Sequence, residues 1–245
     1  MTQAVIGGTG LTELPGLEIT RTHAVETPYG PTSAPIEEGL FAGNPVLFLH
    51  RHGGRSATVP PHLVNYRANI WALHYLGAGS IVAANAVGHI DPVMTPGTLV
   101  IPDQLVDYTW GREHTFGDGA DGTLLHVDFT YPFAAELRAQ LLKAAASAAV
   151  PCRDGGTVAV VQGPRLEAAA EIRRMAQDGC HLVGMTSMPE AGLAREKGLD
   201  YASVCLIVNA AAGVGPDAIS LEDIRRVLEQ ETARFTALLS AFLLT

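Results

Sequence analysis

The segment Tyr201-Ala202-Ser203-Val204-Cys205-Leu206-Ile207-Val208 is the most apolar run in the chain, and the polar residue Asn209 follows it directly. A continuous run of apolar and β-branched residues is typical of a strand that is buried on both faces. Strands of this kind lie in sheets that helices cover on both sides. The segment therefore predicts a central strand of an α/β sheet.

Similar runs recur along the chain, with helical patterns between several of them. Apolar runs predict strands at residues 4–6, 45–49, 80–84, 98–101 and 157–161. Helices are predicted at residues 66–76, 134–148, 166–177 and 189–197, and from Ser220 to the end, where Ser220 and Asp223 form a capping pair. This alternation predicts the α/β class, with helices on both faces of the sheet.

Length and composition fit one globular domain. The chain has 245 residues, of which 47% are hydrophobic, enough to bury one sizeable core. It contains no internal repeat or low-complexity tract, and the glycine-rich stretch 116–123 is typical of a surface loop. We therefore expect a single domain over residues 1–245.

The charge balance argues against a polymer partner. The formal net charge is −9, and the 16 Lys and Arg residues are spread along the chain rather than clustered. Without a dense basic patch, the surface cannot neutralise the phosphates of a nucleic acid or an acidic membrane. We expect neither partner.

Cysteine and histidine usage predicts a cytoplasmic protein without a metal. Cys152, Cys180 and Cys205 are widely spaced, as expected of buried thiols in a reducing compartment. The N-terminus lacks a signal-peptide pattern, and no apolar run approaches the roughly 20 residues that span a bilayer. The nine histidines show no paired ligand spacing with cysteines or carboxylates, so we expect no metal and no cofactor.

The predicted strands end in small and polar residues, where α/β sheets bind their ligands. After the first strand comes Gly7-Gly8-Thr9-Gly10, a turn that lets backbone amides and the Thr9 hydroxyl approach an anion. Glu13 stands where a dinucleotide-binding turn needs a further glycine, which argues against that cofactor. The turn alone is as consistent with a structural role.

Further strand ends offer groups that suit an anion. Arg51 and His52 follow the second strand, and a guanidinium can hold two phosphate oxygens in its planar fork. The stretch 85–88, which contains Asn85 and Ala86, is either a ligand-binding loop or a simple bend. Thr186 precedes a capping box from Ser187 to Glu190, so it would place a hydroxyl and a helix N-terminus near an anion. Together these ends predict an anion site.

Two more positions suggest what the anion reacts with. Leu166 and Glu167 stand where a strand gives way to a predicted helix, and Asn209 ends the most apolar strand. An acidic residue in a first helical turn is commonly a dipole partner, and asparagine at a strand end is commonly a turn former. Taken singly, each has a sufficient structural explanation.

The ordered motifs resemble those of the trimeric purine nucleoside phosphorylases, and most of all the branch of 5′-methylthioadenosine and S-methyl-5′-thioinosine phosphorylases. The resemblance runs from Val5 to the last helix. Its motifs are Gly8-Thr9-Gly10, Arg51-His52-Gly53, Val64-Asn65-Tyr66-Arg67-Ala68-Asn69, Asn85-Ala86-Val87-Gly88, Gly163-Pro164-Arg165, Gly184-Met185-Thr186 and Asn209. It implies a twisted mixed sheet flanked by helices, and a homotrimer.

The resemblance also implies roles for individual residues. It assigns the phosphate site to Thr9, Arg51, His52, Asn85, Ala86 and Thr186. It places Met185 against the ribose and Leu166 against the base, with Glu167 and Asn209 as catalytic readers of the purine. His126 would enter the site of a neighbouring subunit. Inorganic phosphate would then be a co-substrate that attacks the anomeric carbon.

Two positions bear on the substrate. Relatives that use adenine nucleosides carry aspartate where Asn209 stands, so the amide and Glu167 fit a 6-oxopurine better. Leu221 replaces a histidine that lies near the 5′-hydroxyl in inosine and guanosine enzymes, so Leu221 and Ile224 could accept a methylthio group or simply pack the helix start. The resemblance thus implies phosphorolysis of S-methyl-5′-thioinosine to hypoxanthine and 5-methylthioribose 1-phosphate.

Alternatives remain at this stage. The substrate could instead be 5′-methylthioadenosine, inosine or guanosine, and a non-catalytic nucleoside or phosphate sensor would keep the same pocket. Two departures from the family pattern bear on this choice. The loop 54–58 is one residue longer than in relatives and lacks a histidine, and His89 is a satisfied loop residue, an added phosphate contact or an obstruction.

Overall fold

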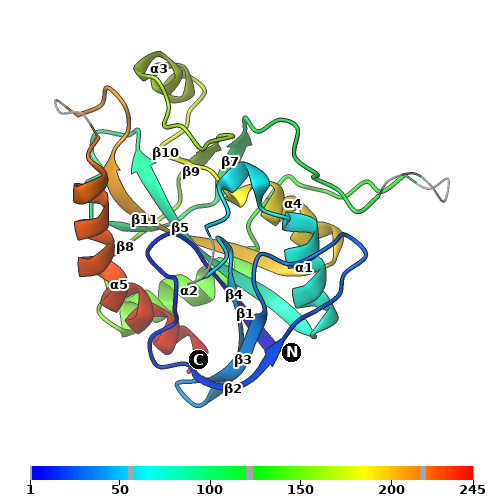
Figure 1. Ribbon diagram of the computed structural model, residues 1–245. Coiled ribbons are helices and arrows are strands. Elements are labelled where there is room, and N and C mark those ends of the chain that lie inside the picture. The colour runs from blue at the N-terminus through cyan, green and yellow to red at the C-terminus, as the bar shows by residue number, and fades with distance from the viewer. Residues whose placement is uncertain (1, 55–57, 118, 120–123, 216–218, 245) are drawn as a thin grey trace.

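In a computed structural model of the chain, one large mixed sheet forms the centre of the molecule (Figure 1). The structure describes residues 2–54, 58–117, 119, 124–215 and 219–244. Its strands are β1 (Thr2–Gly7), β2 (Glu18–His23), β3 (Ile36–Phe41), β4 (Asn44–His50), β5 (Ala78–His89), β6 (Leu99–Ile101), β7 (Gln104–Asp107), β8 (Cys152–Asp154), β9 (Thr157–Val160), β10 (Leu182–Gly184) and β11 (Asp200–Ala210). Its helices are α1 (Tyr66–Tyr75), α2 (Ala135–Ser147), α3 (Ala169–Gln177), α4 (Ser187–Glu196) and α5 (Leu221–Leu243), with a short 3₁₀ helix at Pro61–Leu63.

The strand β5 is the axis of the sheet. One branch runs in the order β2-β3-β4-β1-β5-β10-β9-β7, and a second leaves the other edge of β5 through β11, β6 and β8. The pairs β1–β4, β1–β5 and β5–β11 are parallel, whereas β10 runs antiparallel to β5. The predicted fold class, a mixed sheet with helices on both faces, is confirmed.

Alternating side chains of the central strands fill two cores. Val5, Phe48 and Val82 face one core, which α2 and α5 cover. Their neighbours Ile6 and Leu49 face the other, which α1 and α4 cover. This period-2 pattern explains why the strands read as continuous apolar runs, because both faces are buried.

The two neighbours of β5 on one edge leave a gap between them. Pairing with β1 ends where Ile6 meets Ala83, and pairing with β10 begins only at Gly88, opposite Val183. Residues 84–87 therefore have no strand partner on that edge within the described chain, although β11 pairs with them on the other edge. Main-chain groups of β5 thus remain available in the middle of the sheet.

Two predicted boundaries are wrong in an informative way. The strand predicted at residues 80–84 continues to His89, because β11 pairs with it throughout, so the stretch 85–88 is neither a strand end nor a bend. The helix predicted from residue 166 begins at Ala169, since the Glu171 carboxylate accepts a hydrogen bond from the amide of Ala168 at 2.7 Å and ends the preceding loop there. The capping pair of Ser220 and Asp223 is confirmed.

An extended segment, here called the arm (described residues 108–117, 119 and 124–134), projects from the sheet beyond β7 (Figure 1). Its base is fastened by Phe116, whose ring lies 5.2 Å from that of Tyr29 and 4.4 Å from the Lys197 ammonium. Farther out, Leu124 is 82% exposed, and Leu125 and Val127 are also exposed. No described helix is both long and apolar enough to cross a membrane.

Candidate active site

The gap beside β5 opens into a cavity of about 250 Å³ that collects nearly all of the predicted site residues. From that prediction its walls contain Thr9, Arg51, His52, Asn85, Ala86, Leu166, Glu167, Met185, Thr186, Asn209, Leu221 and Ile224. These residues come from the turns after β1 and β4, from β5, β11 and α5, and from the loops before α3 and α4. His126 is the one predicted site residue that the cavity does not contain.

Arg51 lies at the floor of the cavity with its guanidinium already oriented. The side chain is 1% exposed, and its Nη1 donates to the Ala84 carbonyl at 2.9 Å. Its Nε and Nη2 donate to Glu190 Oε1 and Oε2 at 2.5 and 2.9 Å. A guanidinium has five N–H groups, so two remain for a ligand. The positive charge of Arg51 is held in place by its partners.

Glu190 is not the capping residue that the sequence predicted. It is fully buried, and besides Arg51 it accepts a hydrogen bond from the Tyr201 hydroxyl at 2.9 Å. Thr186 is the N-cap of α4, and the helix is irregular at Met188, so the spacing from Ser187 to Glu190 does not produce a capping box. A buried carboxylate needs a partner of opposite charge, and Arg51 supplies it.

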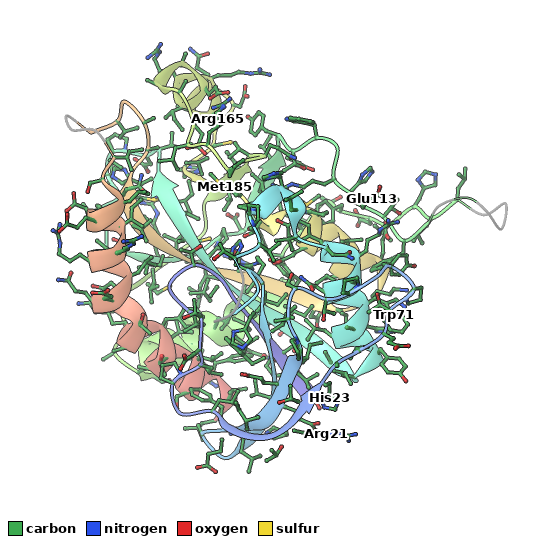
Figure 2. All side chains as sticks on the ribbon, viewed as in Figure 1. Arg21, His23, Trp71, Glu113, Arg165 and Met185 are labelled. Atoms are coloured by element: carbon green, nitrogen blue, oxygen red, sulfur yellow. The ribbon has the colours of Figure 1, made fainter. Side chains whose placement is uncertain are left out.

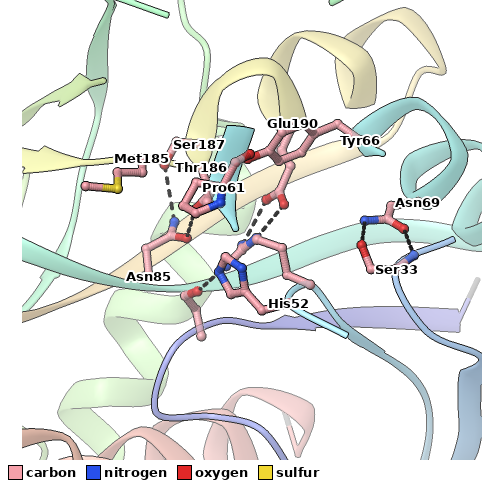
Figure 3. A network of polar contacts seen from close by, with 12 residues as sticks. Ser33, His52, Pro61, Tyr66, Asn69, Asn85, Met185, Thr186, Ser187 and Glu190 are labelled. Atoms are coloured by element: carbon pink, nitrogen blue, oxygen red, sulfur yellow. Dashed lines mark hydrogen bonds and ion pairs between the residues drawn. The ribbon is translucent and has the colours of Figure 1, made fainter. Parts of the chain in front are cut away.

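Asn85 joins the floor of the cavity to the turn before α4 (Figure 3). Its amide donates to Ser203 Oγ at 2.5 Å and to Ser187 Oγ at 3.2 Å, and its Oδ1 accepts from the Thr186 hydroxyl at 3.0 Å. Every hydrogen-bonding group of this side chain is therefore in use. Only the main chain at Asn85 and Ala86 remains available to a ligand.

His52 lines the cavity beside Arg51 and is held in one tautomer. A carbonyl can only accept, so Nδ1 carries the hydrogen in its 2.8 Å contact with the Val59 carbonyl. Burial, together with the neighbouring charge of Arg51, lowers the pKa of His52 below its ordinary value. The ring is therefore neutral at neutral pH, with Nε2 as an acceptor.

The glycine turn after β1 packs against Arg51. A side-chain carbon on Gly8 would lie 2.4 Å from the Ala84 carbonyl oxygen and 2.6 Å from Arg51 Nη1. Only glycine fits there, so Gly8 serves the packing of the site. Thr9, the next residue, lines the cavity.

The opposite wall of the cavity carries Glu167 and Asn209. Burial raises the pKa of Glu167 above its ordinary value. Asn209 lies in β11 opposite Gly88, next to a register shift, rather than beyond the end of the strand, and its Nδ2 donates to the Ala210 carbonyl at 2.7 Å. One N–H and the Oδ1 of this amide remain for a ligand.

Apolar side chains form the middle and the rim of the cavity. Met185 is half-buried and is labelled below Arg165 in Figure 2, and the Arg165 side chain is 70% exposed. Leu166 is 41% exposed and Leu221 is 67% exposed, so both lie at the mouth. Ile224 follows Leu221 along α5. The cavity thus combines polar side chains with apolar ones, two of which lie at its mouth.

Two further positions named from the sequence lie away from the cavity. His89 is buried and its Nδ1 donates to the Asp91 carbonyl at 3.0 Å, so it is a satisfied residue of β5. His126 is exposed on the arm. Of the longer loop, residues 55–57 lie outside the described residues.

Sequence reasoning missed several residues that build the site. These are Glu190, Tyr201, Ser187 and Ser203 around the cavity floor, and Arg112 of the arm. Glu190 was visible only as half of a capping pattern. Within the described ranges, no group of three or more His, Cys, Asp or Glu side chains is placed to hold a metal ion.

In comparisons with known proteins, the chain matches one superfamily and several named enzymes. The phosphorylase superfamily matches residues 2–244. The chain is 48% identical to a probable S-methyl-5′-thioinosine phosphorylase of Pseudomonas syringae, over 98% of this chain and 97% of the relative. It is 40% identical to the 6-oxopurine nucleoside phosphorylase of Pyrococcus furiosus, over 97% of this chain and 90% of the relative.

Solved structures show the same fold. Methylthioadenosine phosphorylase from Schistosoma mansoni, in complex with adenine, superposes with a TM-score of 0.93 at 29% identity. The match covers 100% of this chain and 91% of the other.

Proposed function

The chain belongs to the phosphorylase superfamily, and from that membership we propose that it is a purine nucleoside phosphorylase acting on S-methyl-5′-thioinosine. The observation that carries the proposal is the cavity, whose walls hold groups that suit an anion and groups that suit a purine. Arg51, His52, Thr9 and Thr186 line the anion end, whereas Glu167 and Asn209 line the purine end.

The anion end suits inorganic phosphate. Two free N–H groups of Arg51 and the main chain of β5 donate to phosphate oxygens, and neutral His52 accepts the phosphate hydroxyl through Nε2. The Thr186 hydroxyl, which donates to Asn85 Oδ1 at 3.0 Å, can turn its hydrogen to the phosphate instead. A hydrolytic enzyme would need none of these groups.

The reaction breaks the bond between the anomeric carbon and the purine nitrogen. A phosphate oxygen forms the new bond to that carbon, and the electron pair of the broken bond leaves with the purine. The free N–H of Asn209 donates to the 6-oxo group, its Oδ1 accepts from the imidazole-ring nitrogen once that nitrogen is protonated, and ionised Glu167 accepts the ring N–H found on a 6-oxopurine. The imidazole ring of the departing purine gains one proton, which balances the proton that the attacking phosphate loses, so the products are hypoxanthine and 5-methylthioribose 1-phosphate.

Leu221 and Ile224 support a methylthio group at the 5′ position. Both are apolar and both line the cavity, and neither offers a hydrogen bond to a 5′-hydroxyl. The relative from Pseudomonas syringae is named for the same nucleoside. Inosine, guanosine and 5′-methylthioadenosine are the alternatives that differ at one end of the cavity or the other.

The proposal includes a homotrimer in which His126 completes the site of a neighbouring subunit. The exposed apolar residues of the arm suit burial against a second copy. The three cysteines are unpaired, which suits a cytoplasmic enzyme of purine salvage. Co-expression of His126→Ala and Asn209→Ala subunits tests the exchange, because mixed trimers contain some sites with both residues intact. Activity no greater than that of the two parents would contradict it.

Release of free purine tests the reaction itself. S-methyl-5′-thioinosine, 5′-methylthioadenosine, inosine and guanosine are each incubated with and without phosphate. The proposal expects phosphate-dependent release of hypoxanthine, fastest from the methylthio substrate. A preference for another of the four nucleosides would change the proposed substrate but would still support a phosphorylase. Binding without cleavage of any of the four would identify a nucleoside sensor instead.

A further inference from the structure

Arg112 is a buried arginine on the arm that the proposed reaction does not use. It is 8% exposed, and within the described chain none of its hydrogen bonds reaches a carboxylate. Its Nη1 donates to the carbonyls of Met185 and Met188 at 2.8 and 2.6 Å. Its Nη2 donates to the carbonyls of Val161 and Gln162 at 3.2 and 2.8 Å.

The remaining contacts of Arg112 add a third segment. Its Nε donates to Gln162 Oε1 at 3.2 Å, and its Nη1 lies 3.3 Å from the Tyr66 hydroxyl. The guanidinium also lies over the Tyr66 ring, 5.3 Å from its centroid. Arg112 thus ties the exit of β9, the turn into α4 and the start of α1 into one unit.

The turn into α4 is shaped to meet this arginine. Met188 has φ −115° and ψ 135°, which is not helical, so its carbonyl is free of the helix ladder and accepts from Arg112. A buried carbonyl without a partner is costly, and Arg112 supplies partners for four of them. A planar fork with several donors can do this, whereas the single ammonium of lysine cannot.

These carbonyls stand directly beside the nucleoside half of the cavity. Gln162 leads through Gly163 and Pro164 into the loop that carries Leu166 and Glu167, and Met185 lines the sugar region. The phosphate half has fastenings of its own, because Glu190 orients Arg51 and Asn85 holds Thr186. Arg112 also holds the main chain on both sides of Thr186, but the Thr186 hydroxyl keeps its own partner in Asn85, so we expect loss of Arg112 to affect the nucleoside half more than the phosphate half.

We infer that Arg112 is a positioning residue that holds the purine-reading loop and Met185 in register with each other. The expected change in nucleoside kinetics rests on the proposed function. The expected loosening of the two segments rests only on the contacts described above. It makes the base of the arm part of the nucleoside site of its own chain.

The test compares Arg112→Lys with Glu113→Gln and the wild type. Glu113 is the next residue of the arm, its side chain is 74% exposed, and its partner is Arg67 at 2.9 Å, away from the cavity. Figure 2 shows it on the arm side of the molecule, apart from Met185. In Arg112→Lys we expect the nucleoside KM and the Kd for hypoxanthine to rise on the order of tenfold or more, because charge-assisted hydrogen bonds are lost. The phosphate KM is expected to stay within about twofold, because its anchors are intact.

Hydrogen–deuterium exchange provides a readout that needs no turnover. Amides of residues 161–168 and 185–188 should exchange faster in Arg112→Lys than in Glu113→Gln, whereas those of residues 7–10 should not change. Should Arg112→Lys fail to fold, Gln162→Ala removes the side-chain acceptor of Arg112 Nε and of the Trp110 amide, keeps the main-chain contacts of Arg112, and is expected to shift the same parameters more weakly. Equal changes in both KM values, or unchanged exchange at residues 161–168, would overturn the inference. Absence of phosphorolysis in the wild type would instead overturn the proposed function.

Discussion

Arg51 and Glu190 form a two-point ion pair in the interior of the protein, although 139 residues separate them in the sequence. The side chains are 1% and 0% exposed, and the pair connects the end of β4 with α4. Because Glu190 takes two of the N–H groups of Arg51, the guanidinium can present the others in only one direction. The guanidinium of the proposed phosphate site is therefore oriented by the protein itself.

Replacement of Glu190 by glutamine should weaken both folding and phosphate binding. Breaking a buried pair from one side leaves an uncompensated charge, which costs about 3–5 kcal/mol of unfolding free energy. The phosphate KM should rise more than the nucleoside KM, because Arg51 loses its orientation. Denaturant unfolding and steady-state kinetics measure the two effects, with Glu229→Gln on exposed α5 surface as control. An unchanged phosphate KM in a folded Glu190→Gln protein would contradict this role.

Glu167 should set an acid limb in the pH dependence of kcat/KM. Burial raises the pKa of Glu167 above 4.5, and only its ionised form accepts the purine ring proton. Activity should therefore fall as the pH drops through that raised pKa. In Glu167→Gln the limb should vanish, and kcat/KM should be lower on the order of 10²-fold. A limb that persists in the variant belongs to another group.

The same substitution should make the protein more stable at neutral pH. A raised folded pKa means that the folded state binds this proton more tightly than the unfolded chain does, so stability falls as the pH rises through it. Glu167→Gln cannot ionise and escapes that loss. Its melting temperature should exceed that of the wild type at pH 7, and the difference should shrink at pH 4.

Asn209→Asp should move the base preference toward adenine. A carboxyl group can donate to or accept from the adenine edge, whereas the amide of Asn209 fits the 6-oxo group. We expect the ratio of kcat/KM for 5′-methylthioadenosine to that for S-methyl-5′-thioinosine to rise at least about tenfold. Asn209→Ala should lower kcat/KM for both nucleosides by a similar factor. This control distinguishes the loss of a contact from a change in specificity.

Leu221→His should move the preference at the sugar end. Leu221 is 67% exposed at the mouth of the cavity, so histidine fits there without disturbing the core. A hydrogen bond from this histidine to the 5′-hydroxyl should then raise the ratio of kcat/KM for inosine to that for S-methyl-5′-thioinosine by about tenfold. If the ratio stays constant, Leu221 only packs the start of α5.

The sequence predicted the central sheet better than its edges. Strands with two buried faces appear as apolar runs, and β1, β4, β9 and β11 lie where such runs were found. The edge strand β2 (Glu18–His23) is exposed along almost its whole length and shows no apolar run, so pattern alone could not reveal it. The strands β7 and β8 are short and lie at sheet margins, which leaves equally little signal.

Within the site, the residues that line the cavity were more predictable than those that support it. Thr9, Arg51 and Asn209 follow or end apolar strands, and local pattern exposes them. Glu190 and Arg112 act through partners that are far away in the sequence. Neither the charge of these residues nor their spacing from other residues predicts those contacts. Local sequence could not show that pairing with β11 extends β5 beyond Ala84 to His89, because strand pairing is a property of the folded sheet.

The stretch of β5 at residues 84–87 that lacks a strand partner on one edge bears on how this family can diversify. A point mutation exchanges a side chain and leaves the main chain in place. The part of the proposed anion site that the backbone of β5 forms is therefore kept when single residues are substituted. Leu166, Asn209 and Leu221 at the nucleoside end carry no such protection. We therefore expect relatives to keep phosphate as the co-substrate, while single substitutions change which purine and which 5′ group they accept.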